Sequence, residues 1–197
     1  MFTSAIFAVI LAQVWVLEPL GAPLVLPAAL VGALAAWSTK QAGLAGFSRR
    51  AFLPAVRETI LFTVPTVLLV LTAGAVKGTL HAQPHALVTL GRLVVWAAAQ
   101  QWVLQTIVLR EVRQVVPRWA AVVATALVFA FVHIPNPLLV IMTFVGALAW
   151  CTIYDRHPNV LPMALSHAAG TLAMRCAFDD AVTGRLRIGM AYLRLHV

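Results

Sequence analysis

The chain has 197 residues, of which 62% are hydrophobic and 10% charged, and its mean hydropathy is +0.93. A soluble domain carries about a quarter charged residues, so this composition excludes a water-soluble globular protein and favours one that lies in lipid. The net charge of +8 would suggest nucleic acid in a soluble protein. Here the basic residues lie between apolar runs, where they meet lipid headgroups, and we expect no nucleic-acid partner.

The apolar runs are long and continuous rather than alternating, which favours helices over a transmembrane barrel. We therefore predict an all-α fold, a polytopic transmembrane bundle of about seven helices. It is expected to form a single integral membrane domain over residues 1–197. The expected location is a bacterial inner (cytoplasmic) membrane, crossed several times.

Seven apolar segments follow one another along the chain, separated by charged or proline-containing turns. Residues 38–58 interrupt them with four basic residues among apolar ones, which predicts a loop that contains an interfacial amphipathic piece. The tail of residues 179–197 is expected to lie along the membrane surface. The predicted spans are residues 2–17, 24–37, 59–76, 87–109, 120–133, 138–154 and 160–178.

Polar side chains gather in three of these segments, at a depth where such groups are costly and often functional. Gln101 and Gln105 are four residues apart and share a helix face, with Gln100 about 100° round. The economical arrangement points the polar groups of all three segments at one interior cavity. Interhelical hydrogen bonds would account for any one of these residues taken alone. The polar residues are Gln100, Gln101, Gln105, His133, Ser166, His167 and Thr171.

In order and spacing these residues resemble the CPBP family of intramembrane proteases, also called the CAAX protease and Abi family. Members carry three motifs on three helices: Glu-Glu-x-x-x-Arg, Phe-x-x-x-His, and His followed four residues later by Asn or a small residue. Here the counterparts are residues 100–105, 129–133 and 167–171, and the second motif is matched in full. A separation of 33 residues between Gln100 and His133 fits the family pattern, and residues 87–177 carry the resemblance.

The resemblance implies a CPBP/CAAX-protease-like fold and a set of site positions. In the family, the first glutamate and the histidines are held to activate a water that attacks a peptide bond, because a carboxylate can accept the proton. The catalytic positions correspond to Gln100, His133 and His167, and the pocket positions to Gln101, Gln105, Phe129 and Thr171.

The resemblance also implies a cofactor and partners. The family is often described as metal-dependent, which makes His133 and His167 candidate zinc ligands, although two histidines are too few for a closed zinc site. Typical substrates are prenylated CAAX proteins in eukaryotes and peptides linked to bacteriocins in bacteria. Besides the lipid bilayer, the implied partners are a hydrophobic or prenylated peptide, an isoprenoid, or a membrane-protein complex.

The chain departs from the family at the first motif, where three glutamines replace two glutamates and an arginine. A glutamine amide accepts no proton near neutral pH. The acidic residues offer no substitute, because all six are expected in loops or at helix ends. Glu111 is eleven residues from Gln100, about 16 Å along a helix axis. The six are Glu18, Glu58, Glu111, Asp155, Asp179 and Asp180.

Three interpretations remain open. Replacing the glutamates and the arginine together removes charges of both signs and leaves a neutral cavity whose side chains still form hydrogen bonds. Removing only one sign would leave a lone buried charge, which is strongly destabilising. This favours a homologue that lacks normal proteolysis and acts as a membrane binding or scaffold subunit, with a neutral, isoprenoid-like or lipid ligand. The second interpretation is an enzyme, either an active intramembrane endopeptidase or a repurposed membrane enzyme, that still uses His133 and His167. The third is a structural or transport protein outside the family.

Overall fold

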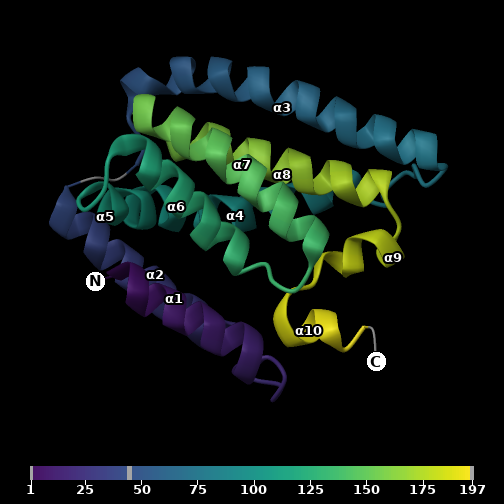
Figure 1. Cartoon of the computed structure of the whole chain (residues 1–197), viewed down its shortest axis with the longest axis horizontal. Coiled ribbons are helices and arrows are strands. Elements are labelled where there is room, and N and C mark those ends of the chain that lie inside the picture. The colour runs from purple at the N-terminus through teal and green to yellow at the C-terminus, as the bar shows by residue number, and fades with distance from the viewer. Residues whose placement is uncertain (1, 44–45, 196–197) are drawn as a thin grey trace. The chain divides into compact units, whose positions relative to one another are not determined.

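The computed structural model describes residues 2–43 and 46–195, and every element named within them is a helix (Figure 1). The all-α prediction is therefore confirmed, as expected for a chain whose backbone groups must pair internally. One isolated β-bridge joins Phe47 and Asn159. The elements are α1 (Phe2–Ala12), the π-helix η1 (Gln13–Leu17), α2 (Val25–Ala42), α3 (Arg49–Lys77), α4 (Ala86–Val103), the π-helix η2 (Leu104–Leu109), α5 (Arg110–Arg113), α6 (Arg118–Phe131), α7 (Pro137–Arg156), α8 (Val160–Ala177), α9 (Asp180–Thr183), the 3-10 helix η3 (Gly184–Leu186) and α10 (Gly189–Leu193).

Each of the seven predicted apolar segments is helical over most of its length. Three helical stretches are long and apolar enough to cross a membrane, judged by length and composition: Arg49–Lys77, Ala86–Arg113 and Pro137–Arg156. Two shorter apolar stretches occupy Phe2–Leu17 and Arg118–Phe131. The described residues thus carry several candidate spans, and the number seven stays a prediction.

The structure corrects the loop predicted over residues 38–58. α2 continues to Ala42, and α3 already begins at Arg49, so Arg49–Glu58 is the first third of a 29-residue helix. Glu58 therefore lies inside a helix and not, as predicted, in a loop or at a helix end. The pattern was misread because this stretch mixes exposed arginines with the small buried residues Ala51 and Ala55, which lowers its hydropathy without breaking the helical period.

The chain forms two compact units. Unit 1 comprises Met1–Ala45, Val103–Leu148 and Leu186–Val197; unit 2 comprises Gly46–Trp102 and Ala149–Arg185. The chain passes from one unit to the other at four points: between residues 45 and 46, next to the end of α4, within α7 and within η3. The three family-like motifs are therefore divided between the units, and the first motif is itself split.

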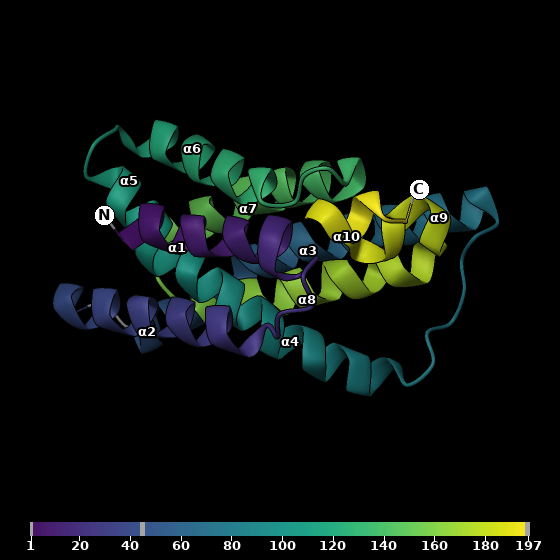
Figure 2. The same cartoon turned by 90° about the horizontal axis from the view of Figure 1, so that it is seen from below.

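In unit 1, α1 packs against α2, which follows it after a short turn (Figure 2). The ring of Phe2 lies edge-on to that of Trp37, with centroids 5.9 Å apart. Two adjacent charged residues, Arg110 and Glu111, form hydrogen bonds with the C-terminal part of α2 and the N-terminus of α1. The Glu111 carboxylate accepts the N–H groups of Phe2 and Thr3 at 3.1 and 3.0 Å, donors that a helix leaves without internal partners. Arg110 donates to the hydroxyl of Ser38 near the end of α2, at 2.5 Å.

In unit 2, α3 and α8 form the most extensive helix pair and lie side by side (Figure 1). They run parallel, because Thr63 meets Ser166 and, about three turns further along both helices, Gly74 meets Ala177. Small residues at these positions let the two backbones approach closely, the usual way in which helices associate in lipid.

The loop after α3 closes the C-terminal end of α8. The last three backbone carbonyls of α8 have no N–H donor within the helix. Each accepts a hydrogen bond from a group in this loop. The Gln83 amide donates to Arg175 O at 2.8 Å, the His81 backbone N–H to Cys176 O at 2.8 Å, and the Thr79 hydroxyl to Ala177 O at 2.7 Å. The pairing of α3 with α8 is thus fixed at this end as well.

Gly74 gives a test of the close approach. A Cβ added there would lie 2.3 Å from Ala177 O and 2.6 Å from its Cα, so backbone would have to move. We expect Gly74→Ala to lower the free energy of unfolding by about 1–3 kcal/mol, the usual cost of overpacking, measured by thermal unfolding in detergent. Gly91→Ala is the matched control, since a Cβ there meets nothing within 4 Å and alanine favours a helix. Equal stability of the two variants would contradict the packing described.

Candidate functional site

His167 is the centre of a polar and aromatic cluster in unit 2. It lies half-buried in α8, and its imidazole stacks on the indole of Trp150 from α7, with centroids 4.8 Å apart and an interplanar angle of 26°. Its Nδ1 lies 3.4 Å from the amide Nε2 of Gln101, on α4. Gln101 is fully buried. The structure thus brings together two of the predicted site residues, His167 and Gln101.

Hydroxyl groups hold Trp150 in this position. Its indole N–H donates at 2.9 Å to the Oγ of Ser166, the residue before His167 in the sequence. The Ser166 hydroxyl lies 2.6 Å from that of Thr63 on α3, which in turn donates to Thr59 O at 2.7 Å. The ring of Phe62 meets Trp150 edge-on. A buried indole N–H needs an acceptor, and the chain of hydroxyls supplies one.

Sequence reasoning missed the part played by Trp150 and by α3. Neither Trp150 nor Thr63 is among the site residues that the sequence predicts. Two signals were present: Ser166 is adjacent to His167, and Thr59 and Thr63 are four residues apart on one face of an apolar helix. Neither signal identifies its partner without the pairing of α3 and α8.

The other predicted residues of the first and third motifs have different surroundings. Gln105 is buried, with 1% of its surface exposed. It belongs to unit 1, in the π-helix η2, whose six residues are all buried. Gln100 is half-buried. The Thr171 hydroxyl donates to His167 O at 2.9 Å, so it bonds its own helix one turn back.

His133 lies in unit 1, and the structure corrects its position. The predicted fifth span extended to residue 133, but α6 ends at Phe131 and His133 lies in the following turn. Its Nδ1 donates to Phe129 O at 2.7 Å, and its ring meets that of Phe129 edge-on with centroids 4.9 Å apart. Because a carbonyl can only accept, Nδ1 carries the proton and Nε2 remains the basic nitrogen of the ring.

A buried asparagine and the C-terminal segment hold the His133 turn. Asn136 is 1% exposed; its Oδ1 accepts the Leu139 N–H at 3.2 Å, and its Nδ2 donates to Arg187 O at 3.1 Å. The Gly189 N–H donates to Ile134 O at 2.9 Å. Asn136 was missed although its sequence position was informative, because asparagine directly before a proline that begins a helix is a typical N-cap.

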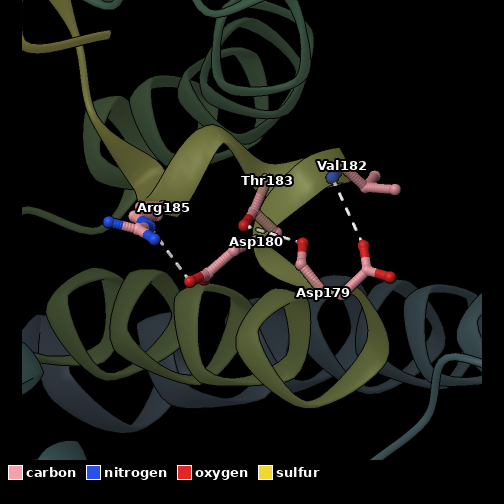
Figure 3. Close-up of polar contacts among 5 residues, drawn as sticks. All are labelled: Asp179, Asp180, Val182, Thr183 and Arg185. Atoms are coloured by element: carbon pink, nitrogen blue, oxygen red, sulfur yellow. Dashed lines mark hydrogen bonds and ion pairs between the residues drawn. The ribbon is translucent and has the colours of Figure 1, made fainter. Parts of the chain in front are cut away.

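All four carboxylates of unit 2 interact with neighbouring groups, Glu58, Asp179 and Asp180 as follows. Glu58 pairs with Arg156 at 3.5 Å and with His157 Nε2 at 3.3 Å. Figure 3 shows the other two in the turn that follows α8: the Asp179 carboxylate accepts the Val182 N–H, and Asp180 forms an ion pair with Arg185 at 3.2 Å. The fourth, Asp155, is the second-last residue of α7.

A zinc ion does not fit the donor set that the structure describes. Within residues 2–43 and 46–195, no three or more His, Cys, Asp or Glu side chains group together in a way that could hold a metal ion. A zinc site in an enzyme usually has three protein ligands besides a water. His133 and His167 alone therefore do not make up such a site, and no chemical step is assigned to a metal.

The groups around His167 include the Gln101 amide, the Trp150 indole and the Ser166 hydroxyl that accepts the indole N–H. Such a group of side chains can donate and accept hydrogen bonds and can cover an apolar chain with aromatic faces. General-base catalysis needs a group that takes up a proton, and among these contacts only the imidazole can do so. The arrangement is suited to binding a neutral ligand.

Comparison with known proteins gives one family match. Residues 82–173 match the family described as Rce1-like, type II CAAX prenyl endopeptidase Rce1-like. The match spans all three motif segments and confirms the resemblance predicted from residues 87–177. No curated protein and no solved structure matches the chain.

Ser166 gives a test of the cluster. We expect Ser166→Ala to lower the free energy of unfolding by about 1–3 kcal/mol, because the Trp150 N–H loses an acceptor in a buried site. Thermal unfolding in detergent measures the change. Ser4→Ala is the control, since Ser4 is exposed on α1 and should change stability by less than about 0.5 kcal/mol. A Ser166→Ala variant as stable as this control would refute the hydroxyl chain.

Proposed function

We propose that this chain, which over residues 82–173 matches the Rce1-like family, binds a prenylated or hydrophobic peptide in the membrane without hydrolysing it. It would act as a binding or scaffold subunit. The proposal includes a bundle that crosses a bacterial inner membrane about seven times.

The observation that carries the proposal is the Gln101 amide beside the His167 imidazole. In the resembled family a glutamate is expected to accept a proton from the attacking water. Gln100 and Gln101 occupy the two glutamate positions, and an amide has no such capacity near neutral pH. Water would remain unactivated at this point, while an amide can still pair with the N–H or C=O of a peptide.

The neighbouring aromatic rings support an apolar ligand. Trp150 stacks on His167, and Phe62 meets the indole of Trp150 edge-on, with ring centroids 6.5 Å apart. Aromatic faces cover isoprenoid and other hydrocarbon chains well, since most of their surface is apolar. The same cluster thus contains an amide that can form hydrogen bonds and aromatic rings that can contact an apolar chain.

One observation favours a second candidate, a membrane enzyme that uses His133. The hydrogen bond from Nδ1 to Phe129 O fixes the ring and leaves Nε2 as a base. An oriented imidazole of this kind is what general-base catalysis requires. In this alternative the chain hydrolyses its ligand with histidine in place of the family's glutamate.

The test is to titrate the purified chain, in detergent, with a fluorescent farnesylated peptide that ends in a CAAX sequence. We expect binding with the peptide left intact, as judged by mass spectrometry. Trp150→Leu should weaken binding about tenfold, because an aromatic contact of about 1.4 kcal/mol is lost. His167→Gln, which keeps hydrogen-bonding groups, serves as a second variant in case the first unfolds, and it too should weaken binding.

Trp96→Leu is the matched control, since Trp96 lies in the same unit, on α4, and is 51% exposed. Its affinity should stay within about twofold of the unmodified chain, as for a residue outside the contact. Equal weakening by Trp150→Leu and Trp96→Leu would refute the site. Peptide cleavage that disappears in His133→Ala would refute binding without hydrolysis and support the enzyme.

A further inference from the structure

α3 is longer than the hydrocarbon core of a bilayer. Its 29 residues span about 44 Å, whereas the core is about 30 Å thick and needs about 20 residues. Residues 59–77 alone cover about 28 Å. The charged N-terminal part, Arg49–Glu58, therefore extends about 15 Å beyond the apolar part of the same helix, which places it at the level of the lipid headgroups.

One side of α3 is apolar and exposed along its membrane part. Ile60, Leu61, Val64 and Leu68 expose 53%, 68%, 51% and 58% of their surface. At 100° per residue they fall in a sector roughly 100° wide. The buried residues of α3, from Ala51 to Gly74, fall outside this sector, on the side toward α8. The exposed sector is thus the side of the helix that meets lipid.

The arginines at the start of α3 continue this same side. Arg49, Arg50 and Arg57 are exposed, and at 100° per residue they fall within roughly the same 120° sector as the apolar residues. Leu53 lies among them and is 74% exposed. A basic and apolar surface at headgroup depth is typical of helices that bind membrane surfaces.

The positive charge of this surface is not neutralised within the described residues. The only acidic residue in the stretch is Glu58, and its carboxylate pairs with Arg156 and His157. Among the described parts of the chain, Arg49, Arg50 and Arg57 form no ion pair or hydrogen bond. Three guanidinium groups are therefore available to one external partner of negative charge.

We propose that Arg49, Arg50 and Arg57 form a binding site for the headgroup phosphates of anionic phospholipids. A guanidinium binds a phosphate through two parallel hydrogen bonds. Leu53 enters the boundary between headgroups and acyl chains, as apolar residues of interfacial helices do. A lipid suits this surface better than an acidic protein does, because the surface is continuous with the lipid-facing side of the same helix.

The experiment uses the full chain in a neutral detergent, titrated with phosphatidylglycerol that carries a fluorescent acyl chain. The double variant Arg50→Gln/Arg57→Gln should weaken binding about 25-fold, from about fivefold for each basic residue near a lipid surface. Lys77→Gln/Arg92→Gln is the matched control, since both residues are exposed and lie outside the proposed surface. It removes the same charge and should change the affinity less than about twofold.

Fluorescent phosphatidylcholine and millimolar inorganic phosphate separate the possible ligands. Preference for phosphatidylglycerol, loss of that preference in Arg50→Gln/Arg57→Gln, and no displacement by phosphate would support the lipid site. Equal weakening by the two double variants would overturn it, since net charge alone would then explain binding. Displacement by inorganic phosphate would also overturn it in favour of a free-anion site. Farnesylated-peptide binding is independent of this result, because the arginines are not part of the His167 cluster.

Discussion

The structure of unit 2 depends on a neutral contact inside an apolar helix assembly, the Gln101 amide beside the His167 imidazole. Buried polar groups must be paired, because an unpaired one loses its hydrogen bonds to water and gains none in return. An amide and an imidazole can meet this need without a net charge. A carboxylate at the same place would bring a buried charge that needs a partner, and the arginine that the family pattern supplies is also replaced, by Gln105.

Segments outside the family-matched residues complete both motif regions. Thr63 and Phe62 come from α3, which precedes residue 82, yet they hold and contact Trp150. In unit 1, backbone groups of Arg187 and Gly189, beyond residue 173, hold the turn that carries His133. Close packing of small residues between α3 and α8 makes the first of these possible. Each motif is therefore supported by parts of the chain that its own pattern does not include.

Much of the fold could be predicted from the sequence, because long apolar runs in a chain with few charges leave helices as the main option. The seven apolar segments are helical, and Gln101 and Gln105 are both buried. The beginning of α3 could not be located in this way. Mean hydropathy averages over all faces of a helix. Exposed arginines on one side therefore lower the mean although the alanines on the other side are buried.

The candidate site was predictable only in part. Residue type and order pointed to His133 and His167, because imidazole is rare and costly at membrane depth. The contacts that define their chemistry depend on tertiary pairing: Trp150 stacks on His167, and Phe129 O fixes the His133 ring. Periodicity within one helix carries no information about which residue of another helix lies opposite. The convergence of all three motifs on one cavity stays a prediction.

The most direct measurement for the central contact is a double-mutant cycle between Gln101→Leu and His167→Leu, read as the free energy of unfolding in detergent. The contact predicts a coupling energy of about 1 kcal/mol, as for residues that share a hydrogen bond. Gln101→Leu combined with His81→Leu is the control, since the His81 side chain is exposed and bonds to Thr79 and Gln83. Additivity of Gln101→Leu and His167→Leu to within about 0.3 kcal/mol would contradict the contact and the neutral binding site built on it.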